Sequence, residues 1–465
     1  MLPILFIAML ATPMALQWAE RIRYTRPRLP RPLDIGVIFS WVVFMYGGLP
    51  VLGFFLAAQG IGSIQEGRLG GDLPAQAQIF QVGLMYCLFN AGFAFAYSAT
   101  RRRAKIWQPT SLAAASSRDV LMALSIFAFT KVSMLAMRLA LGIETEDDYL
   151  ATYTEWAGQP LIVQQVAGIL AASELAVTML VIVAVISKRP KLHVYVAGFV
   201  VAQILATVVI GGSRTQAFAC ALAYIVARSL YDYRLRFGTI LWAGLVGLLL
   251  FLVAGALRQL KVGTEDISGL YLLQGGEFMS VFTNALDLQE RLTDFDGTFL
   301  RAGMYLVDLL RFIPRQFIGD LKIDPATLYV ATFYPEASEA GAGLAFGAIA
   351  ESTIGFGPAE ALVRGLLLGL LYAWVRNACL TRQLSVVRAF VYTWFVVLAY
   401  QGIRDTTFTV FPRFFFQVSP ILAVLWMLGA FQMRRRGRKR QPGVQAPVVV
   451  VPPLTIKATD SAALR

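Results

Sequence analysis

The sequence predicts an all-α polytopic membrane protein with about 11 transmembrane helices and one large extracytoplasmic loop that carries amphipathic or re-entrant helices. Hydrophobic residues make up 57% of the 465 residues and charged residues only 15%, and the mean hydropathy is +0.63. Apolar runs of about 20 residues recur along the chain, which is the length that crosses a hydrocarbon core of about 30 Å. Their apolarity is continuous rather than alternating, which predicts helices and not the strands of a barrel.

The predicted spans account for most of the chain. They cover residues 2–18, 35–56, 76–98, 119–142, 161–187, 192–211, 215–231, 237–257, 359–380, 384–403 and 410–433. The first run lacks a basic start and is followed by arginines, which predicts a membrane helix rather than a cleaved signal peptide. The chain then divides into an N-terminal transmembrane bundle of about eight spans, a large loop, a C-terminal bundle of about three spans, and a tail that is basic and then disordered. These four parts are residues 1–257, 258–358, 359–433 and 434–465.

Basic residues lie at every second connection between the predicted spans. They include Arg21 in the first connection, Arg101 in the third and Lys188 in the fifth. The positive-inside rule therefore places the N-terminus and the long loop outside, and the C-terminus in the cytoplasm. The net charge of +13 is concentrated beside membrane segments, which argues against a nucleic-acid partner.

Three segments of the long loop show patterns of their own. Residues 300–317 place apolar residues at helical spacing between charged ones, which predicts an amphipathic helix on the outer surface. Residues 324–335 contain prolines and aromatic residues and predict irregular structure. The apolar run 344–356 is too short to span a bilayer, so it predicts a re-entrant or surface-bound segment.

Arginines gather on the outer side, which the positive-inside rule leaves poor in positive charge. They are Arg138, Arg258, Arg315, Arg404 and Arg413. Fixed guanidinium groups favour an anionic ligand at the membrane surface, such as the diphosphate of a lipid. For each single arginine the alternative is a long side chain that snorkels to the interface, and for Arg404 it is an ion pair with the neighbouring Asp405.

Arg214 stands in a connection that has almost no loop. The run Gly211-Gly-Ser-Arg-Thr215 joins two apolar segments, and its glycines permit a tight turn with exposed N–H groups. Because anions favour helix N-termini, Arg214 at the start of the next helix is a candidate for anion binding. An ordinary hairpin with a snorkelling arginine is the alternative.

Three further charged residues lie within apolar segments. Lys131 and Glu174 each fall near the middle of a predicted span, and the two spans form a hairpin. They predict a structural ion pair, with a proton- or ion-coupled transport site as the alternative. Glu351 lies in the apolar run before the third-last span, where it is a candidate base for a sugar hydroxyl or an anchor for the loop. The Asp, Glu and His spacings predict no metal and no cofactor.

Several short motifs resemble the Wzy-type oligosaccharide repeat-unit (O-antigen) polymerases. They are Gly212-Ser-Arg-Thr215, the large outer loop, Gly341-Ala-Gly343, Glu351 and Gly355-Phe-Gly357. The resemblance covers roughly residues 200–430, and the family often has an aromatic residue or asparagine where this chain has Thr353-Ile354. It implies a glycosyltransferase of the bacterial cytoplasmic membrane that transfers an undecaprenyl-diphosphate-linked oligosaccharide onto a second lipid-linked unit. It also implies Arg214 and Glu351 as catalytic residues, with a flippase and a chain-length regulator as partners.

Two other functions remain open on the sequence. An O-antigen ligase has a similar architecture, but such ligases usually carry a histidine in the outer loop, and the single histidine here is His193 at a cytoplasmic helix start. A flippase or transporter of lipid-linked glycans is favoured by Lys131 and Glu174. The long loop and the lack of an internal repeat disfavour it.

Overall fold

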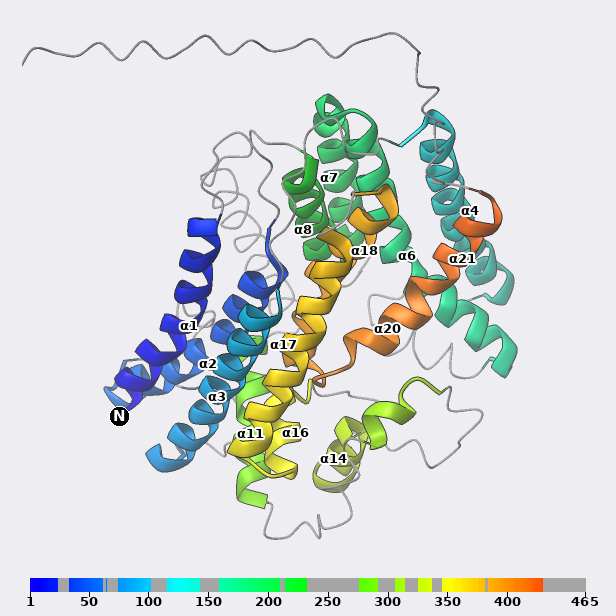
Figure 1. Cartoon of the computed structure of the whole chain (residues 1–465). Coiled ribbons are helices and arrows are strands. Elements are labelled where there is room, and N and C mark those ends of the chain that lie inside the picture. The colour runs from blue at the N-terminus through cyan, green and yellow to red at the C-terminus, as the bar shows by residue number, and fades with distance from the viewer. Residues whose placement is uncertain are drawn as a thin grey trace, which may run out of the picture. The chain divides into compact units, whose positions relative to one another are not determined.

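The computed structural model describes residues 1–23, 33–61, 64, 74–101, 115–142, 159–209, 214–231, 276–291, 306–313, 325–336, 345–380 and 384–429. Within these residues all regular secondary structure is helical (Figure 1). Eight helical stretches of the described residues are long and apolar enough to cross a membrane, judged by length and composition. Two apolar helices, His193–Ile204 and Phe218–Tyr231, are shorter. The predicted class of α-helical, multi-pass membrane protein is therefore confirmed, whereas the span at 237–257 lies outside the described residues.

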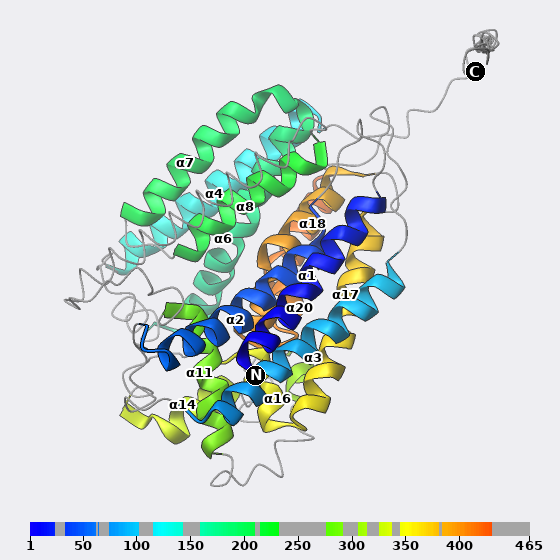
Figure 2. The same cartoon turned by 90° about the vertical axis from the view of Figure 1, so that its left-hand side faces the viewer.

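The first helix group contains α1 (Leu2–Arg23), α2 (Ile35–Ala58), α3 (Gln76–Thr100) and α17 (Pro358–Leu380). Helices α3 and α17, distant in sequence, lie side by side along much of their length (Figures 1 and 2). A Cβ on Gly365 would lie 2.1 Å from the Phe89 carbonyl oxygen, and one on Gly369 would lie 2.4 Å from that of Phe93. Glycine at both positions of this G-x-x-x-G spacing therefore lets the two backbones touch.

The second helix group contains α4 (Ser117–Leu141), α6 (Leu161–Lys188), α7 (His193–Val209) and α8 (Arg214–Tyr231). Helix α6 packs against α4 and α8, and α7 packs against α8. Helix α18 (Val386–Leu398) contacts α6 and α8 on one side and α2 and α17 on the other, so it joins the two groups (Figure 1). Its residues are buried almost throughout, as expected for an apolar helix with neighbours on all sides.

Helix ends follow local rules of capping. The hydroxyl of Ser116 accepts a hydrogen bond from the Asp119 N–H, and the Asp119 carboxylate accepts one from the Ser116 N–H, which closes a capping box at the start of α4. That helix ends at Gly142, whose φ of 64° is left-handed. Asp34 caps α2 by accepting hydrogen bonds from Gly36 N and Val37 N.

The region predicted as one long loop contains helices that pack into the first group. Helix α11 (Gly276–Arg291), which the sequence analysis did not predict, packs against α2, α3 and α16. Helix α14 (Pro325–Phe333) shows that the prediction of irregular structure for 324–335 was wrong. Pro325 occupies the first helical position, where the missing N–H has no partner to lose.

Helix α16 (Ala348–Ile354) is buried at every residue. A surface-bound location for the run 344–356 is therefore wrong, because α16 is enclosed by α3, α11, α17 and α19 (Gln401–Arg404). The predicted last span is also divided. It consists of α20 (Val410–Gln417) and α21 (Ser419–Met427), which meet at Val418, two residues before a proline.

Candidate functional site

Helix α17 carries two buried arginines, Arg364 and Arg376, which lie twelve residues apart. That separation is about 18 Å along a helix axis. A guanidinium inside an apolar bundle needs anionic or polar partners. Each of these arginines organises a separate set of charged side chains, one near each end of α17.

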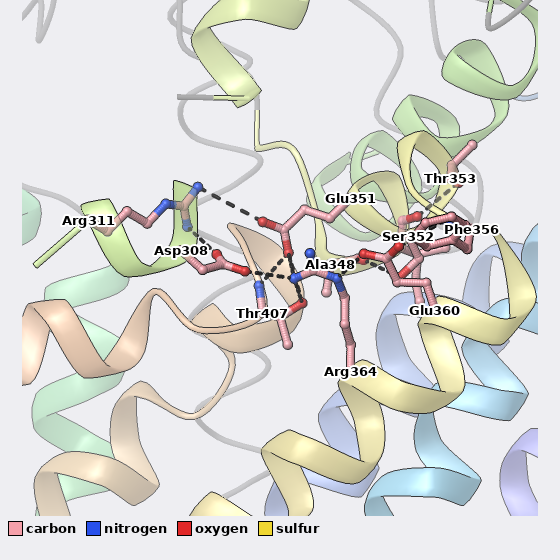
Figure 3. Close-up of polar contacts among 11 residues, drawn as sticks. Asp308, Arg311, Ala348, Glu351, Ser352, Thr353, Phe356, Glu360, Arg364 and Thr407 are labelled. Atoms are coloured by element: carbon pink, nitrogen blue, oxygen red, sulfur yellow. Dashed lines mark hydrogen bonds and ion pairs between the residues drawn. The ribbon is translucent and has the colours of Figure 1, made fainter. Parts of the chain in front are cut away.

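The larger set, here named the Arg364 cluster, comprises Asp308, Arg311, Glu351, Glu360, Arg364 and Thr407 (Figure 3). Arg364 Nε lies 2.6 Å from Glu360 Oε1. Its Nη1 lies 3.0 Å from Asp308 Oδ2 and 3.1 Å from Glu351 Oε2. One arginine thus ties together α16, α17 and the segment 306–313.

Glu351 is completely buried on α16. Its Oε2 accepts hydrogen bonds from the backbone N–H and the hydroxyl of Thr407, both at 2.8 Å. Among the described residues, its Oε1 has no hydrogen-bond partner, and Arg311 Nη2 lies 4.0 Å away. One oxygen therefore anchors the chain after α19, as the structural alternative expects, and the other oxygen is buried next to Arg311.

Asp308, like Glu351, has one carboxylate oxygen that accepts a hydrogen bond and one that accepts none from the described residues. Its Oδ2 is held by Arg364, whereas its Oδ1 is buried without a hydrogen-bond partner in the described part of the chain. Arg311 Nη1 lies 3.9 Å from that oxygen. Burial, and next the negative charge of Glu351, raise the pKa of Asp308 to about 6, against the opposing effect of Arg364 and Arg311.

The segment 306–313 is helical over 306–310 and ends in a turn. Leu306 and Leu309 are 57% and 67% exposed, whereas Val307 and Asp308 are buried. The amphipathic character predicted for 300–317 is therefore present in the described part of that range. Its polar side faces the protein and its apolar side faces outward, as suits a segment in contact with a bilayer.

The Gly355-Phe-Gly357 motif forms the turn between α16 and α17. A Cβ on Gly355 would lie 1.8 Å from Glu360 Oε2, and that same oxygen accepts a hydrogen bond of 2.9 Å from Phe356 N. Gly357 adopts a φ of 63°, which favours glycine. The motif thus leaves room for the Glu360 carboxylate and donates a hydrogen bond to it, and this carboxylate accepts a hydrogen bond from Arg364.

Two of the predicted outer arginines are ion-paired. Arg404 Nε lies 2.6 Å from Glu277 Oε1, and Arg404 Nη1 lies 3.4 Å from Asp405 Oδ1. Arg413 Nη2 lies 2.7 Å from Asp405 Oδ2. The local pairing with Asp405 that was the alternative for Arg404 is therefore present, and a phosphate at either arginine would have to compete with Asp405.

The remaining predicted arginines do not join the Arg364 cluster in the described part of the chain. Arg138 is partly exposed in the last turn of α4 and has no ion pair among the described residues. Arg214 is the first residue of α8, as predicted, and the structure describes its backbone but not its side chain. Arg258 and Arg315 also lie outside the described residues.

Lys131 and Glu174 are brought together as the sequence predicts. Lys131 Nζ contacts Glu174 Oε1 across the interface between α4 and α6. Both residues stand in the middle of their helices. The contact gives each charge a partner, which an apolar surrounding requires.

The second set, near the C-terminal end of α17, contains Glu20, Asp34, Tyr97, Arg101 and Arg376. Arg376 Nε lies 2.7 Å from Asp34 Oδ2, and the Tyr97 hydroxyl donates to Asp34 Oδ1 at 2.7 Å. Arg101 and Arg376 both pair with Glu20. On the sequence, Arg101 predicts only a cytoplasmic connection, so the burial of Arg101 and Arg376 was not expected.

Sequence reasoning also missed Asp308, Arg311, Glu360 and Arg364 as a group. The one available signal is the spacing of Glu360 and Arg364, since residues four apart face each other on a helix. Within the described residues no group of three or more His, Cys, Asp or Glu side chains could hold a metal ion.

Comparison with known proteins gives no further identification: no family model, no curated protein and no solved structure matches this chain.

Proposed function

We propose that this protein polymerises lipid-diphosphate-linked oligosaccharide repeat units on the outer face of the bacterial cytoplasmic membrane. It would transfer the growing chain from undecaprenyl diphosphate to a sugar hydroxyl of a second lipid-linked unit. The observation that carries the proposal is Glu351 in the Arg364 cluster, a buried carboxylate with one oxygen anchored and the other without a hydrogen-bond partner among the described residues.

The chemistry needs a base and a stabiliser of the leaving group. Glu351 Oε1 would take the proton of the acceptor hydroxyl, and the hydroxyl oxygen would attack the anomeric carbon of the donor. The bond from that carbon to the diphosphate breaks, and the diphosphate leaves with the electron pair. Arginines can stabilise this developing charge electrostatically, and Arg214 is the residue to which the family resemblance assigns that role.

The segment 306–313 supports access from the bilayer. Its exposed Leu306 and Leu309 lie on the side opposite the buried Asp308. An apolar face of this kind lies at the boundary between headgroups and acyl chains. A lipid-anchored substrate would thus present its sugars at the level of the Arg364 cluster.

A lipid-linked-glycan flippase or transporter is the second candidate. The observation that favours it is the ion pair of Lys131 and Glu174 in the middle of α4 and α6, because mid-depth charges mark ion pathways in transporters. A ligase, the third alternative, would use the same donor and a different acceptor.

The deciding experiment is a gel ladder of surface glycan from a host deleted for this gene. Single repeat units on the acceptor, restored to a ladder by the wild-type gene and not by Arg214→Ala, would establish a polymerase. Full-length polymer that stays on its lipid carrier would indicate a ligase. Single units trapped on the cytoplasmic leaflet would indicate a flippase.

Glu351→Gln tests the proposed base directly. The amide keeps an acceptor for Thr407 and removes the proton-accepting charge, so turnover should fall by about a hundredfold or more. Binding of the lipid-linked donor should change little. Membrane abundance of the variant provides the folding control, and an equal loss of binding and turnover would contradict the role as base.

A further inference from the structure

Two carboxylate oxygens in the Arg364 cluster lack hydrogen-bond partners among the described residues. They are Asp308 Oδ1 and Glu351 Oε1, and their side chains are only 8% and 1% exposed. A buried carboxylate oxygen without a donor is costly, and such groups in folded proteins call for an explanation. The other oxygen of each carboxylate is already held by Arg364.

Both oxygens face the same guanidinium. Arg311 Nη1 lies 3.9 Å from Asp308 Oδ1, and Arg311 Nη2 lies 4.0 Å from Glu351 Oε1. These distances are too long for direct hydrogen bonds, and an oxygen atom about 2.8 Å from both groups would bridge each of them. A sugar hydroxyl can accept from the guanidinium and donate to the carboxylate. The cluster therefore offers two adjacent places for hydroxyl groups, one at each terminal nitrogen of Arg311.

Charge distinguishes this place from a diphosphate site. The cluster sets three carboxylates (Asp308, Glu351 and Glu360) against two guanidinium groups (Arg311 and Arg364). Among these described groups the carboxylates outnumber the guanidinium groups, which favours a ligand that donates protons. Thr407 adds two donors to Glu351 and no charge.

Asp308 and Glu351 share a hydrogen-bond donor and interact electrostatically. Arg364 Nη1 donates a hydrogen bond to each of them, and Glu360 accepts one from Arg364 Nε on α17. Burial and the neighbouring charge of Glu351 raise the pKa of Asp308 to about 6. The negative charge of one carboxylate thus favours the protonated form of the other.

We propose that Asp308 and Glu351 form a carboxylate pair that binds hydroxyl groups of the acceptor sugar and takes the proton of the attacking hydroxyl. This inference rests on the proposed function. The O–H bond breaks and its proton passes to the pair, while the oxygen forms a bond to the anomeric carbon of the donor. The bond from that carbon to the phosphate oxygen breaks, and the lipid diphosphate leaves with the electron pair. The pair then releases its proton to water.

The test uses host membranes that contain accumulated lipid-linked repeat units and either the wild-type protein, Asp308→Asn, Glu351→Gln or the double variant. Initial polymerisation rates are measured between about pH 5 and pH 8. The wild-type rate should rise with an apparent pKa near that of Asp308, since the pair must be deprotonated. Each single variant should lose about a hundredfold, and the double variant should be no worse than either, because the residues act as a unit.

Two further variants control for folding. Asp308→Glu keeps the carboxylate, so it should restore the rate to within about tenfold of the wild type, together with the rise with pH. Asp287→Asn changes another buried carboxylate, which pairs with Arg291 and accepts hydrogen bonds from Tyr329 and Tyr334 outside the cluster. It should retain the wild-type rate and pH profile.

If Asp308→Asn keeps the wild-type rate and pH profile, the proposed pair is refuted. It is also refuted if the fold-loss of rate in the double variant equals the product of the fold-losses in the two single variants. If the wild-type protein forms no polymer, the proposed function fails instead. The hydroxyl site is then tested by measuring whether the free repeat-unit oligosaccharide of the host raises the Tm of the purified protein. Stabilisation of the wild type that Asp308→Asn loses would support the hydroxyl site, and no stabilisation of the wild type would refute it.

Discussion

At the scale of single residues, the role of a buried charge follows from the complete set of its neighbours. Arg364 and Arg376 stand on one helix and are equally buried, yet their partners differ. Arg376 and Arg101 face Asp34 and Glu20, so each of these two arginines has a carboxylate partner. Among the described residues of the Arg364 cluster, the carboxylates outnumber the guanidinium groups and the pKa of Asp308 is raised, which makes the cluster the better candidate for proton chemistry.

Asp308 should make the stability of the protein depend on pH. Its pKa rises from 3.8 in the unfolded chain to about 6 in the folded protein, so the folded state binds the proton more tightly. This contribution to stability is therefore complete below about pH 3.8 and is lost as the pH rises through about 6. It amounts to on the order of 3 kcal/mol. The Tm of the purified wild type should fall over this range relative to that of Asp308→Asn, and parallel curves would contradict the assignment.

The pair of Lys131 and Glu174 should be structural. Lys131→Met or Glu174→Gln alone leaves one charge unpaired at mid-depth, which should cost about 3 kcal/mol and lower the amount of folded protein. The double variant removes both charges and should restore abundance and the glycan ladder. Abundant double variant without polymer would show instead that the pair takes part in transport or catalysis.

At the scale of elements, small residues and turns set the distances between helices. Gly365 and Gly369 allow α17 to contact the backbone of α3. That contact determines where α17, and with it Arg364, lies relative to α16. The turn at Gly355 then leaves room for the Glu360 carboxylate. The geometry of the Arg364 cluster thus depends on glycines that touch neither substrate nor catalytic groups.

Gly365→Ala should destabilise the protein by about 2 kcal/mol or more, because its Cβ would overlap the Phe89 carbonyl oxygen. Gly198→Ala on α7 is the matched control, since no atom lies within 4 Å of the added methyl group. The control should stay within about 1 kcal/mol of the wild type. Thermal unfolding of both variants in detergent is the measurement, and equal Tm values would refute the tight α3–α17 contact.

At the scale of the whole molecule, α18 connects two helix groups and α17 carries a charge cluster near each end. The proposed function requires the Arg364 cluster to face outward, as the positive-inside rule predicts. The apolar face of the segment 306–313 would then meet the outer leaflet. Orientation is therefore the property of the whole protein on which the proposal depends.

Cysteine labelling checks this orientation. In a variant without Cys87, Cys220 and Cys379, a cysteine is placed at Phe356, which is 60% exposed, or at Ala378 near the other end of α17. In intact spheroplasts a membrane-impermeant maleimide should label Phe356→Cys at once. It should label Ala378→Cys only after the membrane is opened, and the reverse pattern would exclude outer-face chemistry.

The sequence by itself determined the membrane class, the approximate bounds of eight helices and the neighbourhood of Lys131 and Glu174, because hydropathy and local spacing encode these features. It also singled out Glu351, since a carboxylate in an apolar run is conspicuous. It missed α11, whose amphipathic sequence lacks the continuous apolarity of a span, and α14, which at 9 residues is too short for one. Only the tertiary structure decided that Asp308, Glu351 and Arg364 meet. Their contacts join residues 13 to 56 positions apart, and such contacts depend on how helices pack rather than on any local pattern.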